Sequence, residues 1–260
     1  MAVNFMEVTE VSGESISREQ LQRMLNRYAW AAGLSKQKDV LEVACGTGQG
    51  LGCLSKVAKK VHAGDISKEM INLAKQTYQD DSNVDVQVLD VHQLDFPDNS
   101  MDVIICFEAI YYFQDIDKFM TECKRVLRPG GKLLISVANP DLYDFNPSPH
   151  SVRYYGVVEL QELCLKYGLT CKFLADLAVN KVSLVQKVSR PIKKIVIALN
   201  IMPKTMAGKQ FLKRVVFGKM VTMPDTLTPS QLQRAKKLEP ISNMYANKSH
   251  KVIFCEASVE

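Results

Sequence analysis

The sequence lacks the marks of several protein classes. No apolar run approaches the ~20 residues that a membrane-spanning helix needs, and Glu7 and Glu10 interrupt the only apolar stretch near the N-terminus, so we expect no membrane span and no signal peptide. The four histidines are dispersed, and no carboxylate cluster that could hold Mg²⁺ is visible. Repeats and low-complexity segments are absent as well. These absences favour a cytoplasmic protein without a metal centre.

Cysteine usage supports the same compartment. The seven cysteines include no Cys-x-x-Cys pair, and most lie among apolar neighbours, as Cys106 does in Val-Ile-Ile-Cys-Phe. We interpret them as reduced core residues and not as disulfides or metal ligands. With 260 residues, of which 47% are hydrophobic, the chain is long enough for one large α/β domain, with or without an added subdomain.

The stretch from Val40 to Gly50 is the most informative part of the chain. It reads Val-Leu-Glu-Val-Ala-Cys-Gly-Thr-Gly-Gln-Gly. The apolar start predicts a buried strand, and the glycines predict a tight turn into a helix. Such a strand–turn–helix lets backbone N–H groups and the helix N-terminus approach a polar ligand closely. The stretch therefore predicts a cofactor site.

Two common nucleotide motifs do not fit this stretch. A dinucleotide site needs Gly-x-Gly-x-x-Gly, and the third glycine is replaced by Leu51, Cys53 or Ser55 in the three possible frames. A phosphate-binding P-loop needs Gly-Lys-Ser/Thr after the turn, which is also missing. The turn therefore fits neither a dinucleotide site nor a P-loop.

The stretch resembles the first motif of the class I S-adenosylmethionine (SAM) dependent methyltransferases, which is an acidic residue followed by x-Gly-x-Gly-x-Gly. Glu42 is the acid, Gly46 and Gly48 match the second and third glycines, and Ala44 stands at the first. Taken alone, the motif could also be a glycine-rich turn of another α/β protein. The resemblance implies SAM as cofactor and S-adenosylhomocysteine (SAH) as product.

Four later segments resemble the same family in order and spacing. A second predicted strand ends at Asp65, a third strand over 84–89 ends before Asp90, and a fourth covers the apolar run 101–107. Residues 125–135 resemble the family's helix–turn–strand signature. Together these segments resemble the methyltransferase type 11 group over residues 17–175. This implies an α/β fold with a doubly wound, mostly parallel, Rossmann-like sheet of seven strands, and an extra helical insert between strands six and seven.

The resemblance also implies roles in cofactor binding. Asp65 would bind the ribose hydroxyls, although it could instead only cap the next helix, and Ile66 and Met70 would pack on the adenine. Asp90 would accept the adenine amino group, with the backbone N–H of Val91 reaching a ring nitrogen. The full predicted cofactor set is Tyr28, Glu42, Ala44, Gly46, Thr47, Gly48, Asp65, Ile66, Met70, Asp90, Val91 and Phe107. For Tyr28, packing of its helix on the sheet is the alternative.

Methyl transfer asks the protein to align the acceptor, to exclude water and, for a hydroxyl acceptor, to remove a proton. Glu108, after the fourth strand, could take that proton or only satisfy local N–H groups. His150, in the Pro- and Asn-rich loop 139–155, could be a general base or a surface residue. We expect this loop to cover the substrate. The predicted substrate contacts are Tyr111, Tyr112, Asn139, Arg153 and Tyr154, with Arg153 suited to a carboxylate or phosphate.

The region after strand six departs from the family pattern. From residue 181 to 219 the sequence has ten Lys or Arg and no Asp or Glu. We predict an N-terminal arm and helix over 1–36, a SAM-binding core over 37–178 plus 248–258, and a basic helical insert over 179–247. This insert could bind an anionic small substrate, a membrane surface or RNA. Nucleic acid is disfavoured because no RNA-binding module is visible.

These observations predict a SAM-dependent methyltransferase that acts on a small molecule, with a phosphate-bearing or lipid-linked, sugar-like acceptor favoured. Peripheral membrane contact through the basic insert is a variant of this interpretation. Two alternatives are a non-catalytic SAM- or SAH-binding module that acts through the insert, and an RNA-modifying methyltransferase.

Overall fold

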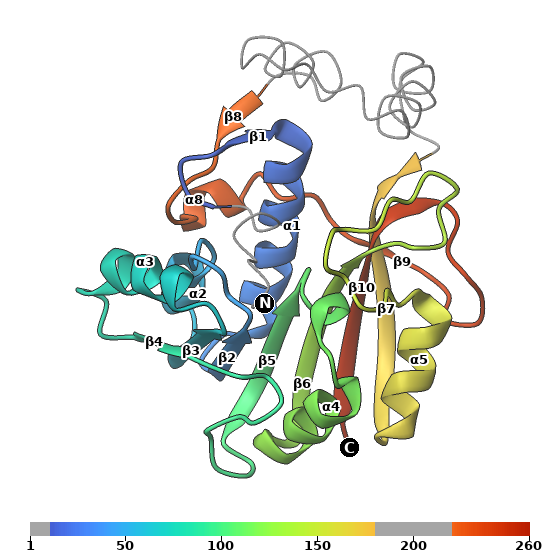
Figure 1. The fold of residues 1–260 in the computed structure, drawn as a ribbon, viewed down its shortest axis with the longest axis horizontal. Helices are drawn as coiled ribbons and strands as arrows, with labels where there is room; N and C mark the ends of the chain where they lie inside the picture. Colours follow the sequence, from blue (N-terminus) through green and yellow to red (C-terminus); the bar gives the residue numbers. More distant parts are fainter. Residues whose placement is uncertain (1–10, 180–219) are drawn as a thin grey trace.

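The computed structural model describes residues 11–179 and 220–260. Its elements surround one eight-stranded sheet (Figure 1). The helices are α1 (Arg18–Leu34), α2 (Leu51–Ser55), α3 (Lys68–Tyr78), the 3-10 turn η2 (Ile110–Tyr112), α4 (Ile116–Val126), α5 (Val157–Lys166) and α8 (Pro229–Leu232). The strands are β1 (Ser15–Ser17), β2 (Asp39–Val43), β3 (Lys60–Asp65), β4 (Val84–Val88), β5 (Met101–Phe107), β6 (Leu127–Ala138), β7 (Leu169–Ala178), β8 (Met220–Thr222), β9 (Glu239–Pro240) and β10 (His250–Val259).

The sheet has the order β4-β3-β2-β5-β6-β10-β7-β9. Neighbours from β4 to β6 are parallel, whereas β10 runs antiparallel to both β6 and β7. This confirms the predicted doubly wound, mostly parallel sheet. It has one strand more than the predicted seven, because the two residues of β9 pair with Leu174 and Ala175 at the edge.

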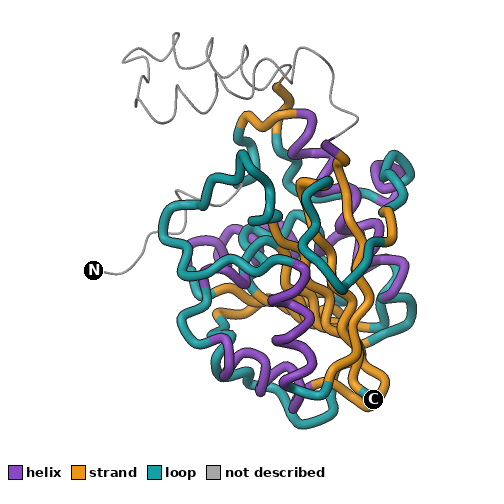
Figure 2. The backbone as a smooth tube through the Cα atoms, turned by 90° about the vertical axis from the view of Figure 1, so that its right-hand side faces the viewer, coloured by secondary structure: helices purple, strands orange, loops and turns teal. Residues whose placement is uncertain are grey.

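Helices and loops surround the strands of the sheet (Figure 2). Each face of the sheet carries its own hydrophobic core. Alternate residues of β2 divide between them: Leu41 packs with the cluster that includes α4 and α5, and Val40 with the cluster that includes α1, α2 and α3. Val40 and Leu41, which follow each other in β2, are both fully buried. Burial on both faces of the sheet explains the near-continuous apolar runs of the central strands. The helices thus cover the two faces of the sheet and leave the carboxyl ends of its strands open.

Local signals place several helix ends. The hydroxyl of Ser17 accepts a hydrogen bond from the Gln20 backbone N–H at 3.1 Å, and the Gln20 side chain accepts one from Ser17 N–H at 2.8 Å. These two hydrogen bonds form a capping box at the start of α1. Thr228 caps α8, with Pro229 at its first position, in the same way. The helix predicted after the glycine-rich turn is α2, which covers only Leu51–Ser55.

Part of the predicted basic insert can be placed. Its residues 180–219, which include the predicted basic run 181–219, lie outside the described residues. After them, β8 pairs antiparallel with β1, and α8 contacts α1. Met223 and Leu227 join the α1 side of the core. Within residues 11–179 and 220–260, no helix has the length and apolarity required to cross a membrane.

Candidate active site

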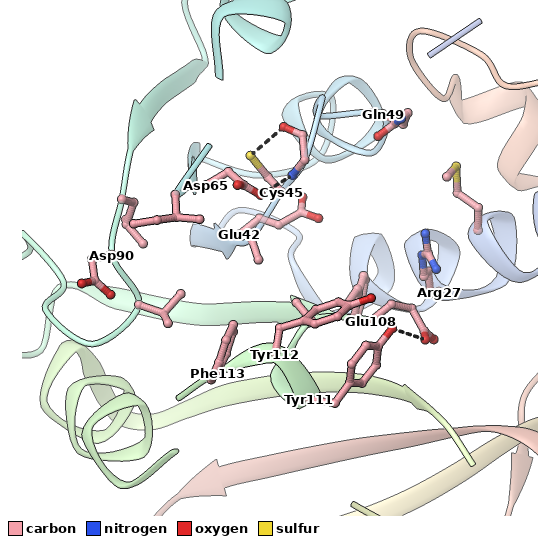
Figure 3. A pocket seen from close by; sticks show the side chains of 18 of the residues that line it. Arg27, Glu42, Cys45, Gln49, Asp65, Asp90, Glu108, Tyr111, Tyr112 and Phe113 are labelled. Carbon is pink, nitrogen blue, oxygen red and sulfur yellow. Dashed lines mark hydrogen bonds between the residues drawn. The ribbon is translucent and has the colours of Figure 1, made fainter. Parts of the chain in front are cut away.

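A cavity of about 520 Å³ opens at the carboxyl ends of β2, β3, β4 and β5 (Figure 3). This size and position are typical of ligand sites in open α/β sheets. Helix α1 lines it with Gln20, Arg23, Met24, Arg27 and Tyr28. The strand ends line it with Glu42, Ala44, Cys45, Gly46, Gln49, Asp65, Ile66, Leu89, Asp90, Val91, His92 and Phe107, and the segment after β5 with Glu108, Ala109, Tyr111, Tyr112, Phe113 and Gln114.

The glycine-rich turn that follows β2 has an unusual backbone. Ala44, Gly46 and Gly48 have φ angles of +51°, +58° and +79°, which is the left-handed region that glycine adopts without steric cost. For Ala44 this conformation costs roughly 1–2 kcal/mol. The turn is therefore a shape that surrounding contacts must hold in place.

Asp65 joins this turn to the end of β3. Its two carboxylate oxygens accept hydrogen bonds from the backbone N–H groups of Gly46 at 3.0 Å and Ser67 at 2.9 Å. The residue is only 8% exposed, and burial raises its pKa while the backbone hydrogen bonds lower it, with a net increase. Asp65 thus both lines the cavity and anchors the neighbouring backbone, so the two interpretations offered for it are compatible.

Glu42 is the most buried acid that lines the cavity. The Tyr28 hydroxyl donates to Glu42 Oε1 at 2.5 Å, and the residue is 2% exposed. Its second oxygen, Oε2, is buried with no hydrogen-bond partner among the described residues. Burial raises the pKa of Glu42 to about 7. Because a buried polar atom is almost always satisfied, the arrangement points to a donor group on a ligand.

Asp90 lies at the third strand end, where the chain leaves β4. Its Oδ1 accepts from the His92 backbone N–H at 2.9 Å and lies 2.7 Å from His92 Nδ1. Partial burial raises the pKa of Asp90, but the hydrogen bonds and charge of His92 outweigh it and lower the value overall. Asp90 is therefore an ionised acceptor at the cavity wall, with His92 as its neighbour.

The opposite wall combines Glu108 with aromatic rings and arginines. Glu108 has φ +51° directly after β5, and its backbone N–H donates to Ser136 O at 2.9 Å. Its carboxylate accepts from the Tyr111 hydroxyl at 3.4 Å and the Ser136 hydroxyl at 3.5 Å, both long bonds. Burial and Glu108 raise the pKa of Tyr111, and Arg27 lowers it, so both charges act on this part of the cavity (Figure 3).

Three predicted cofactor residues do not line the cavity. Thr47 is buried, and its hydroxyl has no partner in the described part of the chain. Gly48 faces α3, since a Cβ there would meet Leu51 at 2.9 Å and Tyr78 at 3.1 Å. Met70 is fully buried in α3.

The predicted loop over the substrate lies beside the cavity. Asn139 is buried and donates to Asn247 O and His250 O, and Arg153 lies over the Tyr155 ring at 5.1 Å. Tyr154 stacks on the outer side of Tyr111, with ring centroids 4.3 Å apart. Neither these residues nor His150, which is exposed with φ +66°, line the cavity. The loop braces η2 through Val152 N–H, which donates to Tyr111 O at 2.7 Å.

Sequence reasoning missed the contribution of α1 beyond Tyr28. Gln20, Arg23 and Arg27 recur every three to four residues, so they share one helix face, and all three line the cavity. Because Tyr28 was predicted to contact the cofactor, the residues on the same side of α1 could have been predicted from their spacing to it. Also missed were Met24, Cys45, Gln49, Leu89, His92, Ala109, Phe113 and Gln114.

One group of cysteines lies outside the cavity lining. The Sγ atoms of Cys164, Cys171 and Cys255 lie within 4.8 Å of one another, between α5 and the strands β7 and β10. Cys164 and Cys255 belong to an apolar core cluster, with Cys171 packed against it. This placement agrees with structural packing, and the expectation that none of the cysteines binds a metal stays a prediction.

Comparisons with known proteins find methyltransferases. Residues 41–135 match the family model of a methyltransferase domain. A probable S-adenosylmethionine-dependent methyltransferase of Mycolicibacterium smegmatis is 34% identical over 132 residues, which is 48% of this chain and 49% of that protein. The chain thus spans about half the length of the curated relatives it matches.

Solved structures show the same fold. A SAM-dependent methyltransferase from Aquifex aeolicus is 26% identical with a TM-score of 0.52, and the match covers 61% of this chain and 89% of that one. The YcgJ protein of Bacillus subtilis is 22% identical with a TM-score of 0.57, over 92% and 98% of the two chains. The second match covers most of this chain and shows a shared fold.

Proposed function

We propose that this chain, whose residues 41–135 match the family model of a methyltransferase domain, is a class I SAM-dependent methyltransferase that binds SAM at the strand ends and transfers a methyl group to a small-molecule acceptor. The observation that carries the proposal is the buried Glu42 carboxylate, whose Oε2 lacks a partner among the described residues. Glu42 lines the cavity together with Asp65 and Asp90. Three acids at three neighbouring strand ends suit a ligand with several donor groups.

The residues fit this cofactor. Glu42 would receive the ammonium group of its methionine part, Asp65 the ribose hydroxyls, and Asp90 with Val91 the adenine. Ile66 is 54% exposed at the cavity edge, where an adenine ring would cover it. When bound, SAM supplies a methyl group on a sulfonium, which is electrophilic without further activation by the protein.

The remaining wall would bind and orient the acceptor. Arg23 and Arg27 supply guanidinium groups that suit a carboxylate or phosphate, while Tyr111, Tyr112 and Phe113 supply apolar surface that excludes water. Glu108 would accept the proton that a hydroxyl acceptor loses. This mixture supports an anionic acceptor with an apolar or ring-shaped part, such as a phosphate-bearing or lipid-linked sugar.

Calorimetric titration with SAM and SAH tests the cofactor, with NAD and ATP as controls. We expect micromolar binding of SAM and SAH and no heat from the controls. Phosphorylated and lipid-linked sugars and RNA are then screened for SAH release. SAM binding without turnover of any acceptor class would favour a non-catalytic module, and turnover of RNA alone would replace the small-molecule acceptor. Absence of SAM binding would overturn the proposal.

The acceptor wall is tested by Arg23→Ala. We expect the acceptor KM to rise about tenfold, because a charged hydrogen bond contributes roughly 1.5–3 kcal/mol when partly buried, while the Kd for SAM stays unchanged. Arg18→Ala is the matched control, since Arg18 lies on the same helix but is exposed and outside the lining. Equal KM values for both variants would remove Arg23 from the acceptor site.

A further inference from the structure

A short segment after β8 lies behind the glycine-rich turn. We name this segment, Met223–Leu227, the clasp. Its two end residues are each 1% exposed and belong to the α1 side of the core. It is tied to the N-terminal arm, because Met223 N–H donates to Glu14 O at 2.8 Å and Met223 O accepts from Gly13 N–H at 3.0 Å. The clasp is therefore a fixed element.

The clasp contacts the turn directly. Leu227 N–H donates to Gln49 O at 2.7 Å, and Gln49 itself lines the cavity. None of the clasp residues lines the cavity. The contact therefore comes from the side of the turn that faces away from the cofactor site.

The Tyr78 hydroxyl extends this contact to two glycines. It lies 2.6 Å from Gly48 O, 3.1 Å from Gly52 N and 2.9 Å from Thr226 Oγ1. A carbonyl oxygen can only accept, so the single phenolic proton goes to Gly48 O. The Tyr78 oxygen then accepts from Gly52 N–H and from the Thr226 hydroxyl. Burial raises the pKa of Tyr78 to about 12, so this proton stays in place at neutral pH.

Gly52 and Thr226 also pack closely against each other. A Cβ at Gly52 would lie 2.1 Å from Thr226 Oγ1, well inside contact distance, and its next nearest atoms would be at 3.5 Å. Gly52 is in the first turn of α2, directly after the glycine-rich turn. Thr226 thus occupies the space that the missing side chain leaves open.

We propose that Thr226 and Tyr78 are positioning residues for the cofactor, which hold the glycine-rich turn in its left-handed shape from behind. The proposal rests on the proposed function. A turn that holds Ala44, a residue with a Cβ, in the left-handed region persists only where its surroundings over-determine it. Without the clasp, the turn would have to be ordered by the cofactor on binding, and this ordering weakens affinity.

The first test compares Thr226→Val with Thr226→Ser. Valine keeps the shape of threonine and removes the hydroxyl, whereas serine keeps the hydroxyl. We expect the Kd for SAH, measured by calorimetry, to rise about 3- to 10-fold in Thr226→Val, the scale of one lost hydrogen bond, and to stay near the wild-type value in Thr226→Ser. Once an acceptor is known, the KM for SAM should rise and kcat stay unchanged.

Thr77→Val is the matched control. Thr77 precedes Tyr78 on α3, is exposed, and its hydroxyl donates only to Leu73 O within the helix. We expect its Kd to equal that of the wild type. A Thr226→Val variant whose melting temperature falls while its Kd for SAH is unchanged would show a merely structural role and overturn the proposal.

A double-mutant cycle tests the contact itself. Gly52→Ala should weaken SAH binding at least 3-fold, because its Cβ displaces Thr226. In a Thr226→Ala background the space is open, so the same Gly52→Ala change should have little further effect. Equal effects of Gly52→Ala in both backgrounds would overturn the proposed contact. If the wild type bound neither SAM nor SAH, the proposed function would fail; if it bound both and Thr226→Val bound equally well, only the clasp proposal would fail.

Discussion

The two halves of the cavity are built in different ways. In the half proposed to bind the cofactor, here called the cofactor half, Glu42, Asp65 and Asp90 lie at or just after the carboxyl ends of adjacent parallel strands, so the register of the sheet places them side by side. In the half proposed to bind the acceptor, here called the acceptor half, Arg23, Arg27 and Glu108 come from a helix face and from a strained residue after β5. The first half follows from local sequence, and the second depends on how α1 and η2 pack.

The largest expected effect lies in the acceptor half. Glu108→Gln should lower kcat about 10²- to 10⁴-fold if the acceptor must lose a proton, the range for general base catalysis, with the Kd for SAM unchanged. Steady-state kinetics with an identified acceptor measure this. Glu69→Gln, an exposed carboxylate on α3 outside the lining, should leave kcat unchanged. An unchanged kcat in Glu108→Gln would show that the acceptor half binds the acceptor but that Glu108 is not a general base.

In the cofactor half, Asp65→Ala should weaken SAM binding on the order of 30- to 150-fold. The reason is the loss of a charged hydrogen-bond pair worth roughly 2–3 kcal/mol, together with the anchors of Gly46 and Ser67. Calorimetry measures this, and Asp65→Asn, which keeps one acceptor oxygen, should give an intermediate value. Wild-type affinity in Asp65→Ala would contradict the assignment of this half.

The pH dependence of the cofactor half is set by Glu42. Its pKa in the folded protein is raised to about 7, above the ordinary value, so the folded state keeps a proton that the unfolded state loses. Without ligand, stability should therefore fall as pH rises from about 4.5 to 7 and then level off. SAM binding, which needs the ionised carboxylate for its ammonium group, should instead strengthen through pH 7.

Glu42→Gln isolates this group from other titrations. Glutamine keeps an oxygen that accepts from Tyr28 but carries no charge. The free energy of unfolding in urea and the Kd for SAM are measured for both proteins from pH 5 to 8, and the differences between variant and wild type are compared. Parallel curves for the two proteins would show that Glu42 does not titrate in this range.

The smallest expected effect concerns the brace of the acceptor half. Tyr112→Phe removes the hydrogen bond between its hydroxyl and Ser148 Oγ, at 2.6 Å. We expect a loss of about 0.5–1.5 kcal/mol in unfolding free energy, the net value of one such bond, and a change in acceptor KM of at most a few-fold. A tenfold change in KM would mean that loop 139–155 shapes the acceptor site more strongly than its contacts indicate.

The sequence predicts much of the cavity lining at the strand ends for a physical reason. Glu42, Gly46, Asp65 and Asp90 sit at strand ends that hydrophobic runs reveal, and parallel strand ends meet at one edge. Thr47, Gly48 and Met70 belong to the same motifs, but their side-chain directions depend on backbone angles that residue types alone do not fix.

The acceptor half was harder to predict because its residues come together only through tertiary packing. Aromatic residues in loop 139–155 suggested a cover over the substrate, yet Tyr154 stacks against the outer side of Tyr111. The sequence alone does not single out Arg23 and Arg27, and only the packing of α1 near the strand ends brings them to the cavity. The clasp is equally remote, since Thr226 meets Tyr78 across 148 positions of sequence.

The position of β10 between β6 and β7 affects how the protein can be made. Residues 179–249 separate β7 from β10, so a ribosome finishes β6 and β7 well before the strand that joins them. Until β10 emerges, both strands present unpaired backbone edges, which are templates for aggregation. The nascent chain should therefore need protection over this interval, while the parallel block from β4 to β6 can already assemble.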